Sequence, residues 1–156
     1  MSAPPELPGP KTTRHLEHIR AMIRGEIEPP AIAKLIGFRC VDIDVGRAVF
    51  ELDAGPQHAN PMGTLHGGVI CDVADAALGM AMASTLEDDE TFTSLDLTVK
   101  FLKPIWTARI RAVGQLVKRS RSLGLAECEV TDPGGSLVAR AYSTCMVLRG
   151  EAARGR

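Results

Sequence analysis

The chain has little net charge, no long apolar runs and no paired cysteines, and each shortage excludes a class of protein. Its 18 basic and 19 acidic residues give a formal charge of -1, so no basic face for nucleic acid or an anionic membrane is expected. Charge or glycine interrupts every apolar run well before the ~20 residues that a membrane span requires. The N-terminus also lacks the basic-then-apolar pattern of a signal peptide. We therefore expect a cytoplasmic protein without nucleic-acid or membrane partners.

The four cysteines are widely scattered and include no C-x-x-C pair. Neither a zinc site nor a disulfide framework is therefore expected, and free, mostly buried thiols are. The sequence also contains no G-x-S-x-G elbow, Walker A loop, H-E-x-x-H pair or dinucleotide-binding glycine pattern. Serine-hydrolase, NTPase, zinc-protease and Rossmann-type readings consequently lack support, and no residue is expected to bind a metal.

Length and composition are those of one globular domain. The 156 residues are 45% hydrophobic and 24% charged, which is enough for a single core. Residues 1–10 are rich in proline and residues 150–156 are short and polar, so we expect both to be flexible tails around one domain over residues 11–149.

Periodicity predicts helices at the start of the domain. Apolar residues recur at three- and four-residue steps between 13 and 27, which is typical of an amphipathic helix with Thr13 as its N-cap. Two prolines at 29 and 30 stop that helix, and one further helical turn is predicted over 31–35.

Extended segments and a second long helix follow. The predicted strands are 38–44, 47–52, 91–101, 108–118, 123–131 and 136–148. Between the second and third of them, residues 69–83 include only two charged side chains, which predicts a helix buried on all sides. Short turns force antiparallel pairing. The predicted fold is therefore α+β: an antiparallel sheet of about six strands wrapped around a central helix, with an extra N-terminal helix.

A glycine pair stands where the central helix begins. Gly67 and Gly68 have no Cβ, so a ligand atom can approach backbone N–H groups that lack an intrahelical partner. The helix dipole strengthens their attraction for an oxygen that gathers negative charge. The alternative is that the pair only permits a tight turn.

Two carboxylates lie further along the same helix. An unpaired, ionised Asp75 in a buried helix would be costly, so it must have a partner, open onto a cavity or carry a raised pKa. Close to an anion-binding helix start, we favour a catalytic role for it. Asp72 lies three residues earlier and is assigned the simpler role of complementing the helix dipole.

These residues form a recognisable pattern. Asn60, Gly63, His66, Gly67 and Gly68 spell N-x-x-G-x-x-H-G-G, and Asp75 follows the histidine by nine residues. The pattern resembles that of the PaaI-like hotdog-fold acyl-CoA thioesterases, with looser similarity over about 30–148. The resemblance implies a hotdog fold, hydrolysis of an acyl-CoA to free acid and CoA, and no cofactor, since CoA is part of the substrate. Because a sheet with open edges and only one helix leaves a strand exposed, we also expect pairing with a second copy, as a homodimer and further as a homotetramer.

The resemblance also implies catalytic roles. Asp75 would act as nucleophile or as the base for the attacking water, across a subunit boundary from the amides that polarise the thioester carbonyl. Those amides are the N–H of Gly67, helped by Gly68, together with the side chain of Asn60. His66 would order the loop.

Ser94, on the strand after the helix, would hold the attacking water. Asn60, His66 and Ser94 also have ordinary alternatives, as a turn residue, a loop-packing histidine and a strand serine.

The rest of the substrate is less strongly indicated. Four basic residues near strand ends are candidates for binding the CoA phosphates: Lys103, Lys118, Arg119 and Arg121. Ordinary solvated turns are their alternative. An apolar pocket built from Met62, Met80 and Met82 could accept aryl or fatty chains. Two other functions stay open: a non-catalytic acyl-CoA binder of the same fold, and a hotdog dehydratase acting on 3-hydroxyacyl thioesters.

Overall fold

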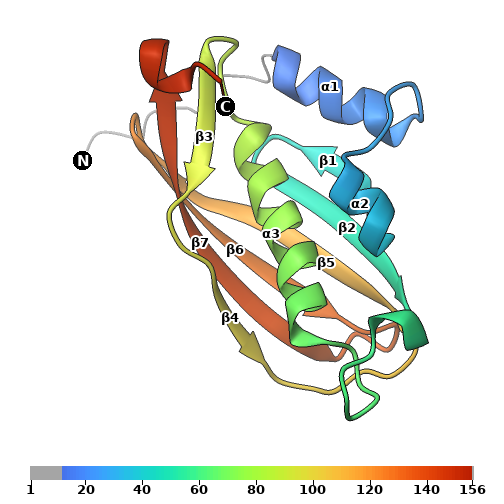
Figure 1. Cartoon of the computed structure of the whole chain (residues 1–156). Coiled ribbons are helices and arrows are strands. Elements are labelled where there is room, and N and C mark those ends of the chain that lie inside the picture. The colour runs from blue at the N-terminus through green and yellow to red at the C-terminus, as the bar shows by residue number, and fades with distance from the viewer. Residues whose placement is uncertain (1–11, 156) are drawn as a thin grey trace.

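An antiparallel sheet curls around one long helix in the computed structural model, which describes residues 12–155 (Figure 1). Its strands are β1 (Arg39–Asp44), β2 (Arg47–Ala54), β3 (Glu90–Ser94), β4 (Thr98–Phe101), β5 (Ala108–Arg119), β6 (Leu123–Thr131) and β7 (Leu137–Arg149). They are ordered β1-β2-β5-β6-β7-β3, and β4 also pairs with β7. The expected sheet around a central helix is confirmed. The tail expected over residues 1–10 lies outside the described residues.

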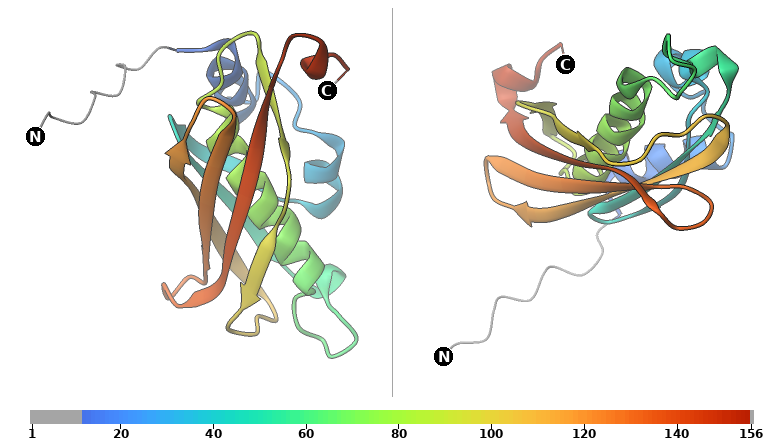
Figure 2. Two further views of the ribbon diagram at one scale, coloured as in Figure 1. Left: turned by 90° about the vertical axis from the view of Figure 1, so that its left-hand side faces the viewer. Right: turned by 90° about the horizontal axis from the view of Figure 1, so that it is seen from below.

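The central helix is α3 (Gly67–Ala83), and it lies in the hollow of the sheet (Figure 2). Val73, Ala77 and Leu78 on α3 are fully buried. The backbones of α3 and β5 are in close contact, because a Cβ on Gly114 would lie 2.4 Å from the carbonyl oxygen of Ala77. The sheet covers only part of the helix, however, and its opposite side is open where Gly68 and Asp75 are exposed. The expectation of a helix buried on all sides is therefore wrong for a single chain.

One predicted strand is in fact two. Ser94 pairs with Cys145 and Thr98 with Tyr142, so the chain holds one extra residue between β3 and β4. Asp96 fixes this irregularity, because its carboxylate accepts the N–H of Thr144 at 2.8 Å in place of a backbone carbonyl. The alternating sequence from Ser94 onward does not reveal such a bulge, since polar and apolar residues continue to alternate through it.

Two short helices precede the sheet. α1 (Arg14–Ile23) is capped by Thr13, whose hydroxyl accepts the N–H of Leu16 at 3.3 Å. The helix ends earlier than predicted because Gly25 takes a positive φ of 75° and the N–H of Glu26 bonds to the carbonyl of Ala21 at 2.9 Å, a glycine-dependent C-cap. α2 (Ala31–Ile36) confirms the predicted turn, and Gly37 ends it at a φ of 94°.

Salt bridges hold the strands together at the end of the molecule near the C-terminus. Glu90 at the start of β3 is buried and forms salt bridges with Arg119 and Arg149. Although burial raises the pKa of Glu90, the N–H of Glu87 and the two guanidinium groups outweigh that effect and lower it. The short 3₁₀ helix η2 (Gly150–Ala153) lies against β3 and β7, in the segment where a tail is expected.

All four cysteines are free, as expected; Cys128 and Cys145 are buried, while Cys40 and Cys71 are partly buried. Within residues 12–155, no helix is long and apolar enough to cross a lipid bilayer.

Candidate active site

The helix start presents one unused backbone donor. His66 is the N-cap of α3, and its Nδ1 accepts the N–H of Gly68 at 2.8 Å. The N–H of Gly67 has no hydrogen-bond acceptor among the described residues, and Gly67 is only partly buried. The sequence-based assignment therefore needs a correction: Gly67 can donate to a substrate oxygen, whereas the donor of Gly68 is already used by the cap.

Asn60 holds the loop before the helix. Its side-chain oxygen accepts the N–H groups of Met62 at 2.9 Å and Thr64 at 3.2 Å, and its amide nitrogen donates to the Thr64 hydroxyl at 2.8 Å. Asn60 therefore has the role of a turn residue, which was the ordinary alternative for it. Because a carboxamide nitrogen carries two hydrogens, Asn60 can still donate one more hydrogen bond.

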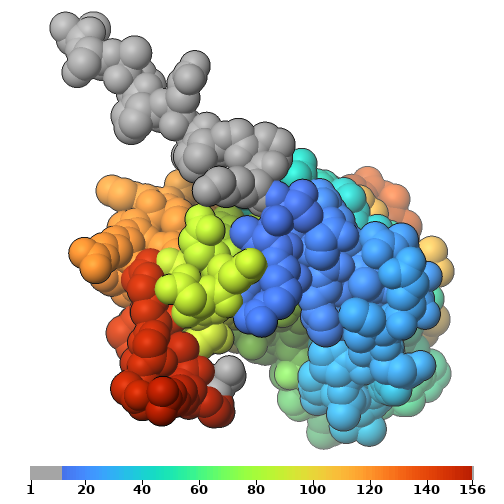
Figure 3. Space-filling model, turned by 90° about the horizontal axis from the view of Figure 1, so that it is seen from above, coloured from blue at the N-terminus to red at the C-terminus, as the bar shows by residue number. Residues whose placement is uncertain are grey.

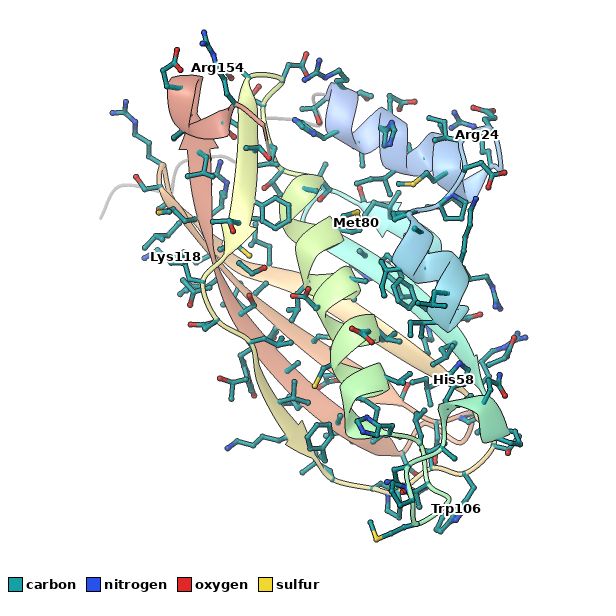
Figure 4. All side chains as sticks on the ribbon, viewed as in Figure 1. Arg24, His58, Met80, Trp106, Lys118 and Arg154 are labelled. Atoms are coloured by element: carbon teal, nitrogen blue, oxygen red, sulfur yellow. The ribbon has the colours of Figure 1, made fainter. Side chains whose placement is uncertain are left out.

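The side chain of His58 holds the same loop in place through hydrogen bonds of both its ring nitrogens. It is buried, its Nδ1 accepts the N–H of Gly55 at 3.2 Å, and its Nε2 lies 2.7 Å from the carbonyl of Ile36. Since Nδ1 accepts, we assign the ring proton to Nε2, which donates to that carbonyl. The carbonyl of His58 accepts the N–H of His66 at 2.9 Å, which fixes the residue that caps α3. In Figure 4, His58 and Trp106 lie near this end of the helix.

A pocket opens beside the free amide, with a volume of about 400 Å³. It is lined by Asn60, Thr64, Leu65, Gly67, Ile70, Phe101, Leu102, Lys103, Pro104 and Ile105. A Cβ on Gly67 would come within 3.1 Å of the Phe101 ring, so this ring stands close over the helix start. Sequence reasoning missed Phe101, because a position at the end of a strand was its only signal.

Asp75 lies on the open face of α3. The carboxylate has no hydrogen-bond or salt-bridge partner in the described part of the chain, and its pKa is raised by partial burial and by the negative charge of Asp72. Asp72 therefore does more than complement the helix dipole. A carboxylate that is unpaired and whose pKa is raised is suited to accept a proton or to attack an electrophile.

Ser94 faces the same part of the helix. The Phe92 ring would lie 3.4 Å from a Cβ on Gly79, so Phe92 points at α3. Ser94 is two residues further along β3 and shares that face, and Asp75 is one turn earlier on α3 and shares the face of Gly79. Because β3 runs opposite to α3 (Figure 1), these offsets bring Ser94 toward Asp75.

Cys145 supports this placement. It is the register partner of Ser94 on β7. Burial raises the pKa of its thiol most, the nearby hydroxyls of Ser143 and Ser94 oppose this, and the negative charge of Asp75 adds to the increase. Asp75, Ser94 and Cys145 therefore lie in one neighbourhood.

The free amide and the carboxylate of one chain cannot serve the same carbonyl group. Asp75 follows Gly67 by eight residues, which at ~1.5 Å per residue is about 12 Å along the helix. A group that attacks a carbonyl and a donor that binds its oxygen must both lie within about 3 Å of the carbonyl. The two groups can act together only if they come from different copies of the chain.

Only one of the basic candidates lies near this site. Lys103 lines the pocket beside Gly67 and pairs with Asp132. Arg119 is at the other end of the sheet: it pairs with Gly124, where a Cβ would touch the sulfur of Met82 near the C-terminal end of α3.

Lys118 and Arg121 belong to this distant end as well, and Lys118 is far from Trp106 in Figure 4. Within one chain the structure therefore separates Lys118, Arg119 and Arg121 from the helix start.

The three methionines do not form one pocket. Met62 is 82% exposed in the loop, Met82 is fully buried, and Met80 lines a separate cavity beneath α1. No cluster of three or more potential metal-ligating His, Cys, Asp or Glu side chains occurs in residues 12–155.

Comparison with known proteins identifies the family. The model of the thioesterase superfamily matches residues 62–139, which is half of the chain and includes the helix start, α3 and Ser94. The chain belongs to the thioesterase superfamily. The unused amide and the unpaired carboxylate thus lie in an enzyme family whose chemistry is hydrolysis of thioesters, and the hotdog fold expected from the sequence is confirmed.

Individual relatives agree with this assignment. A phenylacetic acid degradation-related protein of Ralstonia eutropha superposes with a TM-score of 0.75 at 31% identity, over 82% of this thioesterase and 98% of that chain. The PaaI protein of E. coli has the same fold, with a TM-score of 0.76 at 22% identity over 86% of this chain and 96% of its own. The predicted resemblance to PaaI-like thioesterases is therefore confirmed.

Curated sequences add named activities. A 1,4-dihydroxy-2-naphthoyl-CoA hydrolase of Listeria monocytogenes is 26% identical over 118 residues, which are 76% of this chain and 96% of that protein. Acyl-coenzyme A thioesterase 13 of Homo sapiens is 23% identical over 135 residues, which are 85% of this chain and 96% of that protein.

Proposed function

We propose that this thioesterase hydrolyses an aryl- or fatty-acyl-CoA to the free acid and CoA, at a site that two copies of the chain complete. The observation that carries the proposal is the pair of unsatisfied groups on α3, the N–H of Gly67 and the carboxylate of Asp75. The activities named for the curated relatives, both of which act on CoA thioesters, support CoA as the leaving group.

The steps follow from these groups. The N–H of Gly67, with Asn60 beside it, donates a hydrogen bond to the thioester oxygen as that oxygen gains negative charge, an interaction whose loss typically costs about 3 kcal/mol in the barrier. Asp75 of the second copy either attacks the carbonyl carbon or removes a proton from a water that attacks it. The carbon–sulfur bond then breaks, and CoA leaves as a thiolate that takes up a proton. On the general-base route this step gives the free acid directly. On the nucleophilic route it leaves an anhydride between the acyl group and Asp75, which water then cleaves to release the acid and restore the carboxylate. Ser94, which faces Asp75, holds the water.

Both roles of Asp75 require its ionised form. At an ordinary pKa of ~3.9 a carboxylate is a weak base, and the raised pKa of Asp75 makes its ionised form a stronger one. The geometry is compatible with the nucleophilic and the general-base route.

The second copy is proposed to cover the open face of α3 and the nearby sheet edge. Leu95 and Leu97 are exposed between β3 and β4, and a sheet edge with exposed apolar side chains is a ready template for pairing. A homodimer of this kind, associating further as a homotetramer, would bring the two unsatisfied groups together. Lys103 at the mouth of the pocket is the basic residue proposed to contact CoA.

The test is Asp75→Asn, which keeps the side-chain shape and removes the charge. We expect thiol release from a panel of acyl-CoAs to fall by about 10²- to 10⁴-fold, with the melting temperature nearly unchanged because the carboxylate has no hydrogen-bond or salt-bridge partner among residues 12–155 to lose. Asp89→Asn, in the exposed loop before β3, is the matched control and should keep full activity.

Three results would overturn the proposal. They are near-normal hydrolysis by the Asp75 variant, binding of acyl-CoA by the wild type without release of thiol, and formation of an enoyl thioester from a 3-hydroxyacyl-CoA in place of hydrolysis.

A further inference from the structure

A second, larger cavity lies under α1, away from the helix start. Its volume is about 520 Å³, and it is bounded by α1, by the C-terminal end of α3 and by the start of β3. Met80 reaches into this region beneath α1 in Figure 4. Most of the lining is apolar, with Ile19, Met22 and Phe92 among the walls. We refer to it as the α1 cavity.

Two hydrogen bonds hold α1 in place over the cavity. The backbone N–H of Arg14 donates to the carboxylate of Asp88 at 2.8 Å, and its guanidinium donates to the carbonyl of Asp88 at 2.9 Å. This ties the first turn of α1 to the loop before β3, and Figure 3 shows α1 beside that segment at this end of the molecule. Hydrogen bonds between α1 and the loop before β3 therefore hold the walls of the cavity together.

One polar atom in the cavity lacks a partner. Nε2 of His15 is buried and has no hydrogen bond within the described residues, while His15 lines the cavity. A buried polar atom without a partner is unfavourable. A ligand hydroxyl can donate or accept, so it can satisfy Nε2 whichever ring nitrogen carries the proton.

The cavity continues the face of α3 that carries Asp75. Gly79 and Ala83 follow Asp75 at four-residue steps, so the three lie along one side of the helix. Ala83 lines the cavity, and the Phe92 ring that stands over Gly79 also lines it. From Asp75 to Ala83 the rise is about 12 Å, the reach of a medium-length acyl chain.

We propose that the α1 cavity receives the far end of the substrate's acyl group and that a hydroxyl carried at that end pairs with His15. This inference rests on the proposed acyl-CoA thioesterase function. It assigns a substrate class: acyl-CoAs with an apolar acyl group long enough to pass Phe92, preferred when the distal carbon carries a hydroxyl.

The test compares butanoyl-CoA, decanoyl-CoA and ω-hydroxydecanoyl-CoA by kcat/KM for thiol release. The wild type should prefer the hydroxylated substrate over decanoyl-CoA by roughly 10-fold, as expected where one buried hydrogen bond is gained. His15→Leu should abolish that preference, and His15→Gln, which can still hydrogen-bond, should retain part of it. Ala83→Leu fills the cavity and should lower kcat/KM for both long substrates relative to butanoyl-CoA. Glu17→Gln, on the exposed side of α1, is the control.

The outcomes separate the two claims. If butanoyl-CoA is hydrolysed but the wild type does not distinguish the two decanoyl substrates, or if His15→Leu leaves their ratio unchanged, the inference about the α1 cavity is overturned and the proposed function stands. If the cavity-filling variant lowers hydrolysis of all three substrates equally, the acyl group does not enter the cavity. If no acyl-CoA releases thiol, both claims fail.

Discussion

Asp75 shows how the surroundings of one side chain prepare it for chemistry. It lies on a largely apolar helix, close to a second carboxylate, and has no cation beside it in the described chain. Partial burial and the charge of Asp72 both oppose ionisation. The sequence could single out the residue and offer a raised pKa as one of three alternatives, but it could not predict the exposure of Asp75 in a single chain, because that depends on how far the sheet extends around α3.

A first prediction concerns Asp72. Replacing it with Asn removes a negative charge near Asp75, so the pKa of Asp75 should fall. Because the proposed mechanism needs ionised Asp75, the acidic limb of the kcat/KM profile against pH should move to lower pH. Asp89→Asn, distant from the site, should leave the profile in place. A limb that does not move, or that moves to higher pH, contradicts the assigned role of Asp72.

Gly67 and Gly68 show what a sequence pattern can and cannot predict about free backbone amides. The spacing of the motif predicted a helix start with available amides, and the structure has one. The pattern alone could not show that His66 already uses the N–H of Gly68, because the capping geometry depends on the rotamer of the histidine and on the loop that Asn60 and His58 hold in place.

At the scale of the elements, the contact between α3 and β5 determines the position of the candidate site. The approach of their backbones at Gly114 is closer than any side chain would allow, and it sets the depth of α3 in the sheet. The fold class could be predicted from alternation and turn residues. The division into β3 and β4 could not, because it depends on a hydrogen bond from Thr144 to Asp96 across strands.

A second prediction tests this close approach. Gly114→Ala should lower the free energy of unfolding by about 3 kcal/mol, because the new methyl group meets the backbone of Ala77 and Leu78. Gly124→Ala meets the Met82 side chain, which can adopt another rotamer, and should be less destabilising. Urea denaturation of the two variants measures the difference. Equal effects, or a stable Gly114 variant, would show that α3 does not lie against β5 at this depth.

At the scale of the whole molecule, the proposed site is incomplete in one chain. The helix geometry places Gly67 and Asp75 about 12 Å apart, and neither group has a partner among residues 12–155. An assembly with two-fold symmetry would form two equivalent sites, each using the amide of one copy and the carboxylate of the other. The sequence suggested this arrangement only through its resemblance to a family, since no residue pattern in one chain specifies which surface meets a second copy.

The central claim can be tested with a mixed dimer. One copy carries Asp75→Asn. The other carries Gly67→Pro, which removes the N–H at a helix position that tolerates proline. The preceding residue, His66, has a ψ of 132°, which suits a residue before proline. The Phe101 ring near Gly67 is 55% exposed and has room to shift. Co-expression with two different affinity tags allows the mixed dimer to be purified.

The measurement is acyl-CoA hydrolysis by this mixed dimer, compared with each variant alone. Each homodimer should lose at least about 10²-fold in kcat. The mixed dimer should regain roughly half of the wild-type activity, because one of its two sites then combines an intact Gly67 amide with an intact Asp75. A mixed dimer no more active than the single variants would contradict a site shared between two copies.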